Sequence, residues 1–423
     1  MSDRAQLADD TARRATRFAM LALLLSATVL QRFGIGSAEF ALSPAMIAVY
    51  VLLAVAGLAG ALAVSATRCT LYLIGVGVGF TSFLFNEQRS SFSSLLLLLL
   101  LYLPFVFMLK EQSLADSDGD WIWRQFSRIA LFCACAGIAQ FFAQFAIHSP
   151  VLFDITSLIP PFLRNSGEFN TVIPVGGFNK ANGFFFREPS AFSFFMALAL
   201  ISELVSHKRP LRIACYGLAL LLTYSGTGIL VLLIGTCYPL GRKTLIRLGA
   251  VACAGALVFG LLGDSLNLSF TLGRLSEFES TRSSGYIRYI APGRLLEELF
   301  TSDPWSAWVG HGPGTIFRTV REYEFHDPTW AKLLFEYGAL GFATFVSLFA
   351  FTLRRGAIPM QVRASLFWTW LVTGGHLLSP EQNYLTLALI GLLPLSARLS
   401  EGRPREPLLE EAPAAEVDGV LHA

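Results

Sequence analysis

The chain has 423 residues, of which 54% are hydrophobic and 15% are charged, and its formal net charge is +2. A typical soluble domain carries about 25% charged residues, so this composition excludes an ordinary soluble enzyme, a disordered chain and a disulfide-stapled secreted module. The hydrophobic residues also occur in long runs. The sequence therefore predicts an all-α polytopic membrane protein.

The apolar runs predict about 12 transmembrane helices, because a hydrocarbon core of about 30 Å takes roughly 20 apolar residues per helix. The predicted spans are 18–33, 43–64, 69–85, 92–109, 128–148, 190–205, 211–223, 227–240, 246–263, 331–353, 363–378 and 382–397. The spans 211–223 and 227–240 have the alternative of forming one long helix, but the motif YSGTG at 224–228 is typical of a tight turn and favours two. The leucine run at 95–101 is expected to face lipid.

The spans divide into a group of five in 18–148, a group of four in 190–263 and a group of three in 331–397. Two long loops, 149–189 and 264–330, separate the groups, and the ends are a cytoplasmic segment 1–17 and a disordered tail 398–423. Apart from Arg32 and Arg89, the basic residues of short loops all fall on one side of this arrangement. The positive-inside rule then predicts that both termini are cytoplasmic and both long loops periplasmic.

The first long loop ends in GGFNKANGFFFREPSAFSFF at 176–195, which places Lys180, Arg187 and Glu188 just before a span. Pro189 suits the first turn of that helix, whose N-terminus carries a partial positive charge. Together with Arg187 this favours binding of a phosphate or diphosphate at the membrane boundary. Glu188 is either a base or a group that stabilises the helix N-terminus. The alternative interpretation is an interfacial anchor with a salt bridge at the cap.

The second long loop holds Arg282, Arg288 and Arg294 at intervals of six. Acidic residues outnumber the arginines of this loop, which argues against binding of nucleic acid or of anionic lipid in general. An arginine here would act as a single bidentate group that fits phosphate oxygens.

The Gly-rich motif GHGPG at 310–314 either lets the backbone approach a ligand closely or is an ordinary loop turn. His326 and Asp327 precede the last group of spans, where a histidine can serve as a base near neutral pH or be an unremarkable exposed side chain. The spans are expected to be nearly free of ionisable residues, and no Cys or His pattern predicts a metal site.

Four stretches in this order carry a resemblance to a known family. They are GFFFREPSAF, YSGTGILVLL, SGYIRYIAPGRLLEELFTSDPWSAWVGHGPGTIF and HDPTWAKLLFEYGALG, within 176–341. The chain resembles the O-antigen polymerase and ligase superfamily of Wzy-like membrane glycosyltransferases, and most closely its exopolysaccharide-polymerase branch of the xanthan type. His326 is followed by Asp-Pro-Thr, whereas ligases commonly have His followed by Asn, which favours a polymerase.

The resemblance implies a metal-independent enzyme of the bacterial inner membrane that uses undecaprenyl-diphosphate-linked oligosaccharide and needs no cofactor. It would move one glycan onto a hydroxyl of another lipid-linked unit at the periplasmic face, with the growing polysaccharide chain and membrane lipid as partners. A chain-length-regulating co-polymerase is a further candidate partner. The expected diphosphate-binding residues are Arg187 and Arg288, then Arg294, Arg282 and Lys180; the expected base is His326, with Glu188 and Asp327 as rivals.

Two other functions stay open. An O-antigen-type ligase differs from the polymerase only in its acceptor. A flippase or transporter of lipid-linked sugars would carry charged residues along a central cavity, and the near absence of ionisable residues from the predicted spans argues against it.

Overall fold

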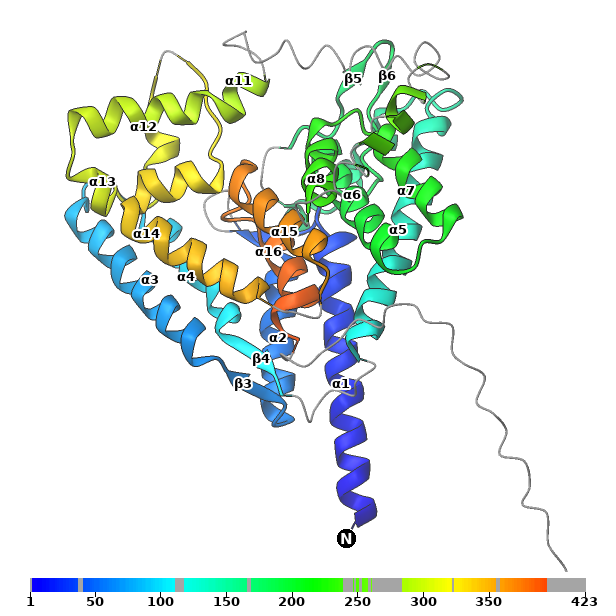
Figure 1. Ribbon diagram of the computed structural model, residues 1–423, viewed down its shortest axis with the longest axis horizontal. Coiled ribbons are helices and arrows are strands. Elements are labelled where there is room, and N and C mark those ends of the chain that lie inside the picture. Colours follow the sequence, from blue (N-terminus) through cyan, green and yellow to red (C-terminus); the bar gives the residue numbers. More distant parts are fainter. Residues whose placement is uncertain are drawn as a thin grey trace, which may run out of the picture.

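The computed structural model describes residues 2–36, 41–110, 118–165, 169–238, 246, 249–250, 253–257, 260, 284–321, 323–354 and 358–393. This part of the chain is mostly helical (Figure 1). Half of the predicted span 246–263, and all of the loop segment 264–283 and the tail 398–423, lie outside the described residues.

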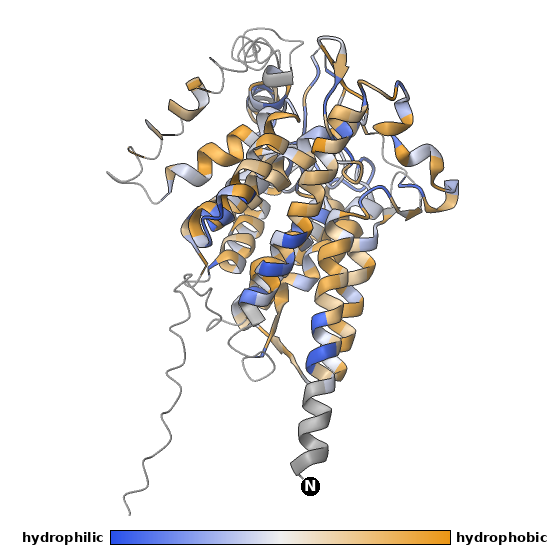
Figure 2. Ribbon diagram, turned by 90° about the vertical axis from the view of Figure 1, so that its right-hand side faces the viewer, coloured by the Kyte–Doolittle hydropathy of each residue, from blue (hydrophilic) through white to orange (hydrophobic). Residues whose placement is uncertain are grey.

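Four of the described helices are long and apolar enough to cross a membrane, which supports a multi-pass membrane protein. They are α3 (Ala66–Phe85), α5 (Asp118–Ala143), α6 (Pro189–Ser206) and α14 (Thr329–Leu353). Shorter apolar helices accompany them: α2 (Pro44–Leu58), α4 (Phe92–Tyr102), α7 (Pro210–Leu221) and α8 (Gly226–Cys237). Figure 2 shows hydrophobic residues over much of the helical ribbon, with shorter hydrophilic stretches among them.

The remaining helices flank these. The first, α1 (Ser2–Thr28), begins well before the predicted span 18–33 and runs through the centre of the view in Figure 1. After residue 283 come α11 (Ser284–Tyr289), α12 (Ala291–Ser302) and α13 (Ser306–Val309), and the last helices are α15 (Met360–Val372) and α16 (Pro380–Thr386). A π-helical turn at Leu387–Gly391 continues α16.

Two of the predicted spans end earlier than expected, because their ends form a small two-stranded antiparallel sheet instead of helix. Strand β3 (Leu62–Val64) pairs with β4 (Phe107–Leu109), so the predicted helical ends of 43–64 and 92–109 are wrong. Gly60 in the left-handed region, with φ 66°, follows the C-terminal cap of α2, and Pro104 turns the end of α4 into a 3₁₀ segment. The leucines of α4 are mostly buried, so the expected lipid-facing run is also wrong.

Other breaks follow the residues that interrupt helices. The predicted split of 211–240 is confirmed, since α7 and α8 are separate and Tyr224 between them has a positive φ of 46°. The predicted span 363–378 is interrupted after Val372 by Gly374 and Gly375, and Pro380 starts α16. Two further antiparallel strand pairs, β1 (Ile35–Gly36) with β2 (Ala41–Leu42) and β5 (Pro174–Val175) with β6 (Phe178–Asn179), lie in loops.

Arg68 lies in the short loop between the predicted spans 43–64 and 69–85, which the positive-inside rule places in the cytoplasm. In the structure its side chain is buried at the start of α3. Its guanidinium donates to the carbonyl oxygens of Gly391 at 2.9 Å, Phe105 at 3.3 Å and Thr352 at 3.4 Å. One arginine thereby provides hydrogen bonds to carbonyl groups at the ends of three other segments. Without such a partner, a carbonyl group in apolar surroundings would cost free energy.

The helix α14 is interrupted at Gly338, whose φ of 66° and ψ of −170° are not helical. A Cβ atom at this position would lie 2.3 Å from the carbonyl oxygen of Trp308, and one at Gly310 would lie 2.4 Å from the carbonyl carbon of Glu336. The backbones of the two segments therefore touch at a pair of glycines, and only glycine fits either position.

The same contact replaces the helical hydrogen bonds that the interruption removes. The N–H groups of His311 and Gly312 donate to the carbonyl oxygens of Phe335 and Glu336 at 2.8 Å and 3.1 Å, and the Ser82 hydroxyl also donates to Glu336 O at 2.6 Å. The motif GHGPG thus provides close contact with another part of the backbone. In addition, α12 packs on the first turns of α14 through a small apolar cluster with Leu295, Ile316 and Phe335.

We expect Gly338→Ala to lower the free energy of unfolding by at least about 1–3 kcal/mol, because alanine rarely adopts this backbone conformation and its Cβ would meet the Trp308 carbonyl. Gly77→Ala is the matched control. Gly77 is an exposed glycine of α3 with open space at its Cβ position, and alanine there should leave stability unchanged or raise it by about 0.5–1 kcal/mol. Thermal unfolding of both purified variants, followed by tryptophan fluorescence, measures the difference; equal midpoints would contradict the expectation.

Candidate functional site

A cavity of about 310 Å³ lies near the C-terminal end of α1, since Gln31, three residues after that helix, forms part of its wall. Its wall combines the residue Gln31 after α1, the start of α6, Thr227 at the start of α8, a residue of α11, the segment before α14 and the stretch 373–382. Five of the predicted site residues line it: Arg187, Glu188, Arg288, His326 and Asp327. Residues from both long loops therefore meet in one cavity.

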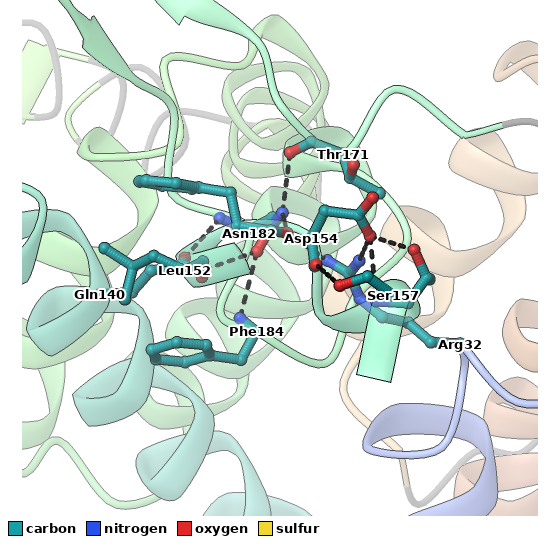
Figure 3. Close-up of polar contacts among 10 residues, drawn as sticks. Arg32, Gln140, Leu152, Asp154, Ser157, Thr171, Asn182 and Phe184 are labelled. Atoms are coloured by element: carbon teal, nitrogen blue, oxygen red, sulfur yellow. Dashed lines mark hydrogen bonds and ion pairs between the residues drawn. The ribbon is translucent and has the colours of Figure 1, made fainter. Parts of the chain in front are cut away.

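The loop 149–189 is held in place by a buried amide network centred on Asn182 (Figure 3). Gln140 of α5 donates from Nε2 to Asn182 Oδ1 at 2.8 Å and accepts from the N–H of Gly183 at 2.9 Å. Asn182 Nδ2 donates to the carbonyl oxygens of Phe153 and Thr171 at 2.8 Å and 2.9 Å. Each polar group is satisfied inside the protein, which is what a buried amide requires.

A second contact ties the same loop to the end of α1. The side chain of Arg32 is 2% exposed, pairs with Asp154 at 3.2 Å and donates to the Phe153 carbonyl at 2.9 Å (Figure 3). Burial is the largest influence on this arginine and lowers its pKa to about 10, while Asp154 opposes the shift. The loop 149–189, which leads to Arg187, is therefore held by α5 through Gln140 and by the end of α1 through Arg32.

Arg187 and Glu188 immediately precede α6. Glu188 is the N-cap residue with extended backbone, Pro189 is the first helical residue, and Ser190 Oγ donates to Glu188 Oε2 at 2.9 Å. Arg187 does not pair with Glu188, as the predicted cap salt bridge would require, but with Glu381 of α16 at 2.5 Å. The α6 N-terminus borders the cavity through Ser190 and Ala191, so its partial positive charge faces the same space.

His326 lies at the cavity wall, where a Cβ atom at Gly374 would lie 3.4 Å from the His326 Cβ, and its backbone N–H donates to the Ile287 carbonyl at 2.9 Å. Although part of the side chain is exposed, burial lowers the pKa of His326 below its usual value of 6.5. The guanidinium of Arg288 lowers the pKa further, while the carboxylates of Asp327, Glu188 and Glu324 oppose the shift. The imidazole is therefore neutral at neutral pH and able to accept a proton.

Asp327 connects the cavity to a buried group of charges at the start of α14. Lys332 Nζ lies 3.2 Å from Asp327 Oδ2 and 3.7 Å from Glu336 Oε1, and the Lys332 and Glu336 side chains are 1% and 0% exposed. The Phe317 ring packs against the lysine with its centroid 3.9 Å from Nζ. The expectation that the spans are nearly free of ionisable residues is wrong here, because Lys332 is buried together with carboxylates five residues before it and four residues after it, so that the charges are buried as pairs.

Three predicted site residues are not brought to this cavity. Lys180 is buried in the first loop without lining the cavity. Arg294 is exposed on α12, where it pairs with Glu298 at 3.0 Å and stacks on Tyr323. Arg282 lies outside the described residues.

The stretch 373–382 was not predicted as part of a site, because residues 373–378 and 382 belong to predicted spans and 379–381 to the short connection between them, yet it supplies eight of the residues that line the cavity. A signal was present in its sequence, TGGHLLSPEQ: two glycines and a Ser-Pro pair interrupt a helix more often than they continue one. The pairing of Glu381 with Arg187 had no such signal, since the two residues are 194 positions apart.

Comparison of this chain with protein-family models, with curated proteins and with solved structures finds no match.

Proposed function

We propose that this chain is a polysaccharide polymerase that joins undecaprenyl-diphosphate-linked oligosaccharide units at the periplasmic face of the bacterial inner membrane. The observation that supports this most is the meeting of Arg187, Arg288 and His326 in one cavity, although they come from loops far apart in the sequence. Two arginines suit a diphosphate, and a neutral histidine suits a base. The long apolar helices suit an enzyme whose donor is a lipid.

In this reaction the acceptor hydroxyl attacks the anomeric carbon of the donor sugar, and the bond from that carbon to the diphosphate oxygen breaks. The electron pair leaves with the lipid diphosphate, and the hydroxyl proton passes to His326. Arg288, Arg187 and the N-terminus of α6 stabilise the negative charge as it develops. Asp327 already has Lys332 as its partner, which leaves His326 and Glu188 as the better bases.

The volume of about 310 Å³ is at the lower end of small-molecule sites. It suits a diphosphate with the adjoining sugar, while the rest of the glycan and the prenyl chain extend beyond it. A ligase would use the same groups with a different acceptor, so the acceptor has to be identified by experiment.

A strain that lacks this protein should accumulate single lipid-linked repeat units, because units are made and exported but not joined. Gel electrophoresis and mass spectrometry of the extracted lipids identify them. Full-length polymer left on its lipid would point to a ligase, and the absence of outward-facing repeats would point to a flippase.

Arg187→Ala and Arg288→Ala should each reduce polymer formation by about 10²-fold or more, because each removes a cation that stabilises the leaving diphosphate. Arg294→Ala is the matched control. It removes an exposed arginine of the second long loop, which also holds Arg288, but away from the cavity, and polymer yield should stay near that of the wild type. Polymer length and yield are measured at equal protein levels. Wild-type polymer from both Arg187 and Arg288 variants would exclude the mechanism.

The pH dependence of kcat/KM should have an acid limb below pH 6.5, since His326 must be unprotonated to act as the base and its pKa is lowered. Arg288→Gln removes a neighbouring positive charge, raises the pKa of His326 and moves the limb to higher pH. Glu188→Gln removes a negative charge and moves the limb to lower pH. A limb that stays in place in both variants would mean that another group is the base.

A further inference from the structure

Glu381 is a buried residue at the border of the cavity. The hydrogen bonds of its carboxylate hold the side chain in one orientation. It lies in the first turn of α16 with a side chain 3% exposed, and Ser379 Oγ donates to its Oε2 at 3.1 Å. Its Oε1 lies 2.5 Å from Nη2 of Arg187. Each carboxylate oxygen therefore has a partner, and one of these partners is an arginine to which the proposed function assigns diphosphate binding.

Arg187 is held from three directions. Glu381 accepts from Nη2, the Gln31 carbonyl accepts from Nε at 2.9 Å, and the Phe169 ring lies against the guanidinium with its centroid 4.7 Å from Cζ. Within the described residues, Nη1 has no hydrogen-bond partner, and the side chain remains 18% exposed. The arginine thus has one edge fixed by the protein and the other available to the cavity.

The difference in burial between the two partners decides what happens when an anion arrives. If Arg187 moved away to follow a phosphate, Glu381 would keep a buried negative charge with only the Ser379 hydroxyl beside it, which is strongly unfavourable. Arg187 therefore keeps its contact with Glu381 and meets the anion through Nη1.

We propose that Glu381 is a positioning residue, which orients Arg187 toward the diphosphate of a prenyl-diphosphate ligand. This rests on the proposed function and adds the residue that organises its anion site. The contrary role is competition, in which the carboxylate neutralises Arg187 and weakens anion binding. The two roles predict opposite signs, because loss of the Glu381 charge weakens binding in the first case and strengthens it in the second.

Binding of farnesyl diphosphate to the purified full-length protein tests this directly. Glu381→Gln should weaken binding roughly 10-fold to 100-fold. This is the range found for metal sites when the hydrogen-bond partner of a metal-ligating side chain is removed. Glu381→Asp keeps the charge and should recover part of the loss. Glu298→Gln is the matched control, since it neutralises a carboxylate paired with Arg294 outside the cavity and should leave binding unchanged.

A double-mutant cycle separates positioning from a general structural role. In the Arg187→Ala background Glu381→Gln should cause no further loss of binding, because the carboxylate acts only through the arginine. If Glu381→Gln does not fold, the same cycle is made with Glu381→Asp. Tighter binding by Glu381→Gln, or an equal loss in both backgrounds, overturns the proposal while the proposed function stands. Failure of the wild-type protein to bind farnesyl diphosphate overturns both.

Discussion

The contact between Gly310 and Gly338 is the constraint on which the arrangement around the cavity depends. It interrupts α14 after its first turns, and the carbonyl groups that the interruption frees are satisfied by the N–H groups of the GHGPG turn. The first part of α14 is thereby separated from the rest of the helix and packed beneath the second loop. Because His326 and Asp327 lie directly before this part, the glycine contact also determines where they stand.

The charges beside the cavity are held by partners from inside the protein. Lys332 fixes Asp327, and Glu381 fixes Arg187; in each case the inner partner is almost completely buried. A buried ion pair adds little to stability by itself, but removing one partner leaves an expensive unpaired charge. Such pairs therefore hold a side chain in one orientation more firmly than a pair in water would, and this matters more at a binding site than in the core.

The sequence allows prediction of the residues that stand beside helix starts, and it fails where contacts join distant segments. Arg187, Glu188, His326 and Asp327 were predicted because each directly precedes an apolar run, and the cavity brings all four together with Arg288. Residues 373–378 were wrongly predicted as the end of a membrane span, because Leu377 and Leu378 raise the hydrophobicity of a segment in which Gly374 and Gly375 end the helix. The amide network of Gln140 and Asn182 depends on tertiary packing, which local composition does not encode.

The balance of charge at the cavity fits a base that begins neutral and ends protonated. Arg187 has Glu381 as its partner and Asp327 has Lys332, so Arg288 and Glu188 are the charged lining residues without an ion pair among the described residues. In the proposed reaction the free enzyme keeps the pKa of His326 low through burial and through Arg288. A diphosphate beside Arg288 offsets that positive charge and favours the imidazolium. The leaving group thus stabilises the protonated base at the step that forms both.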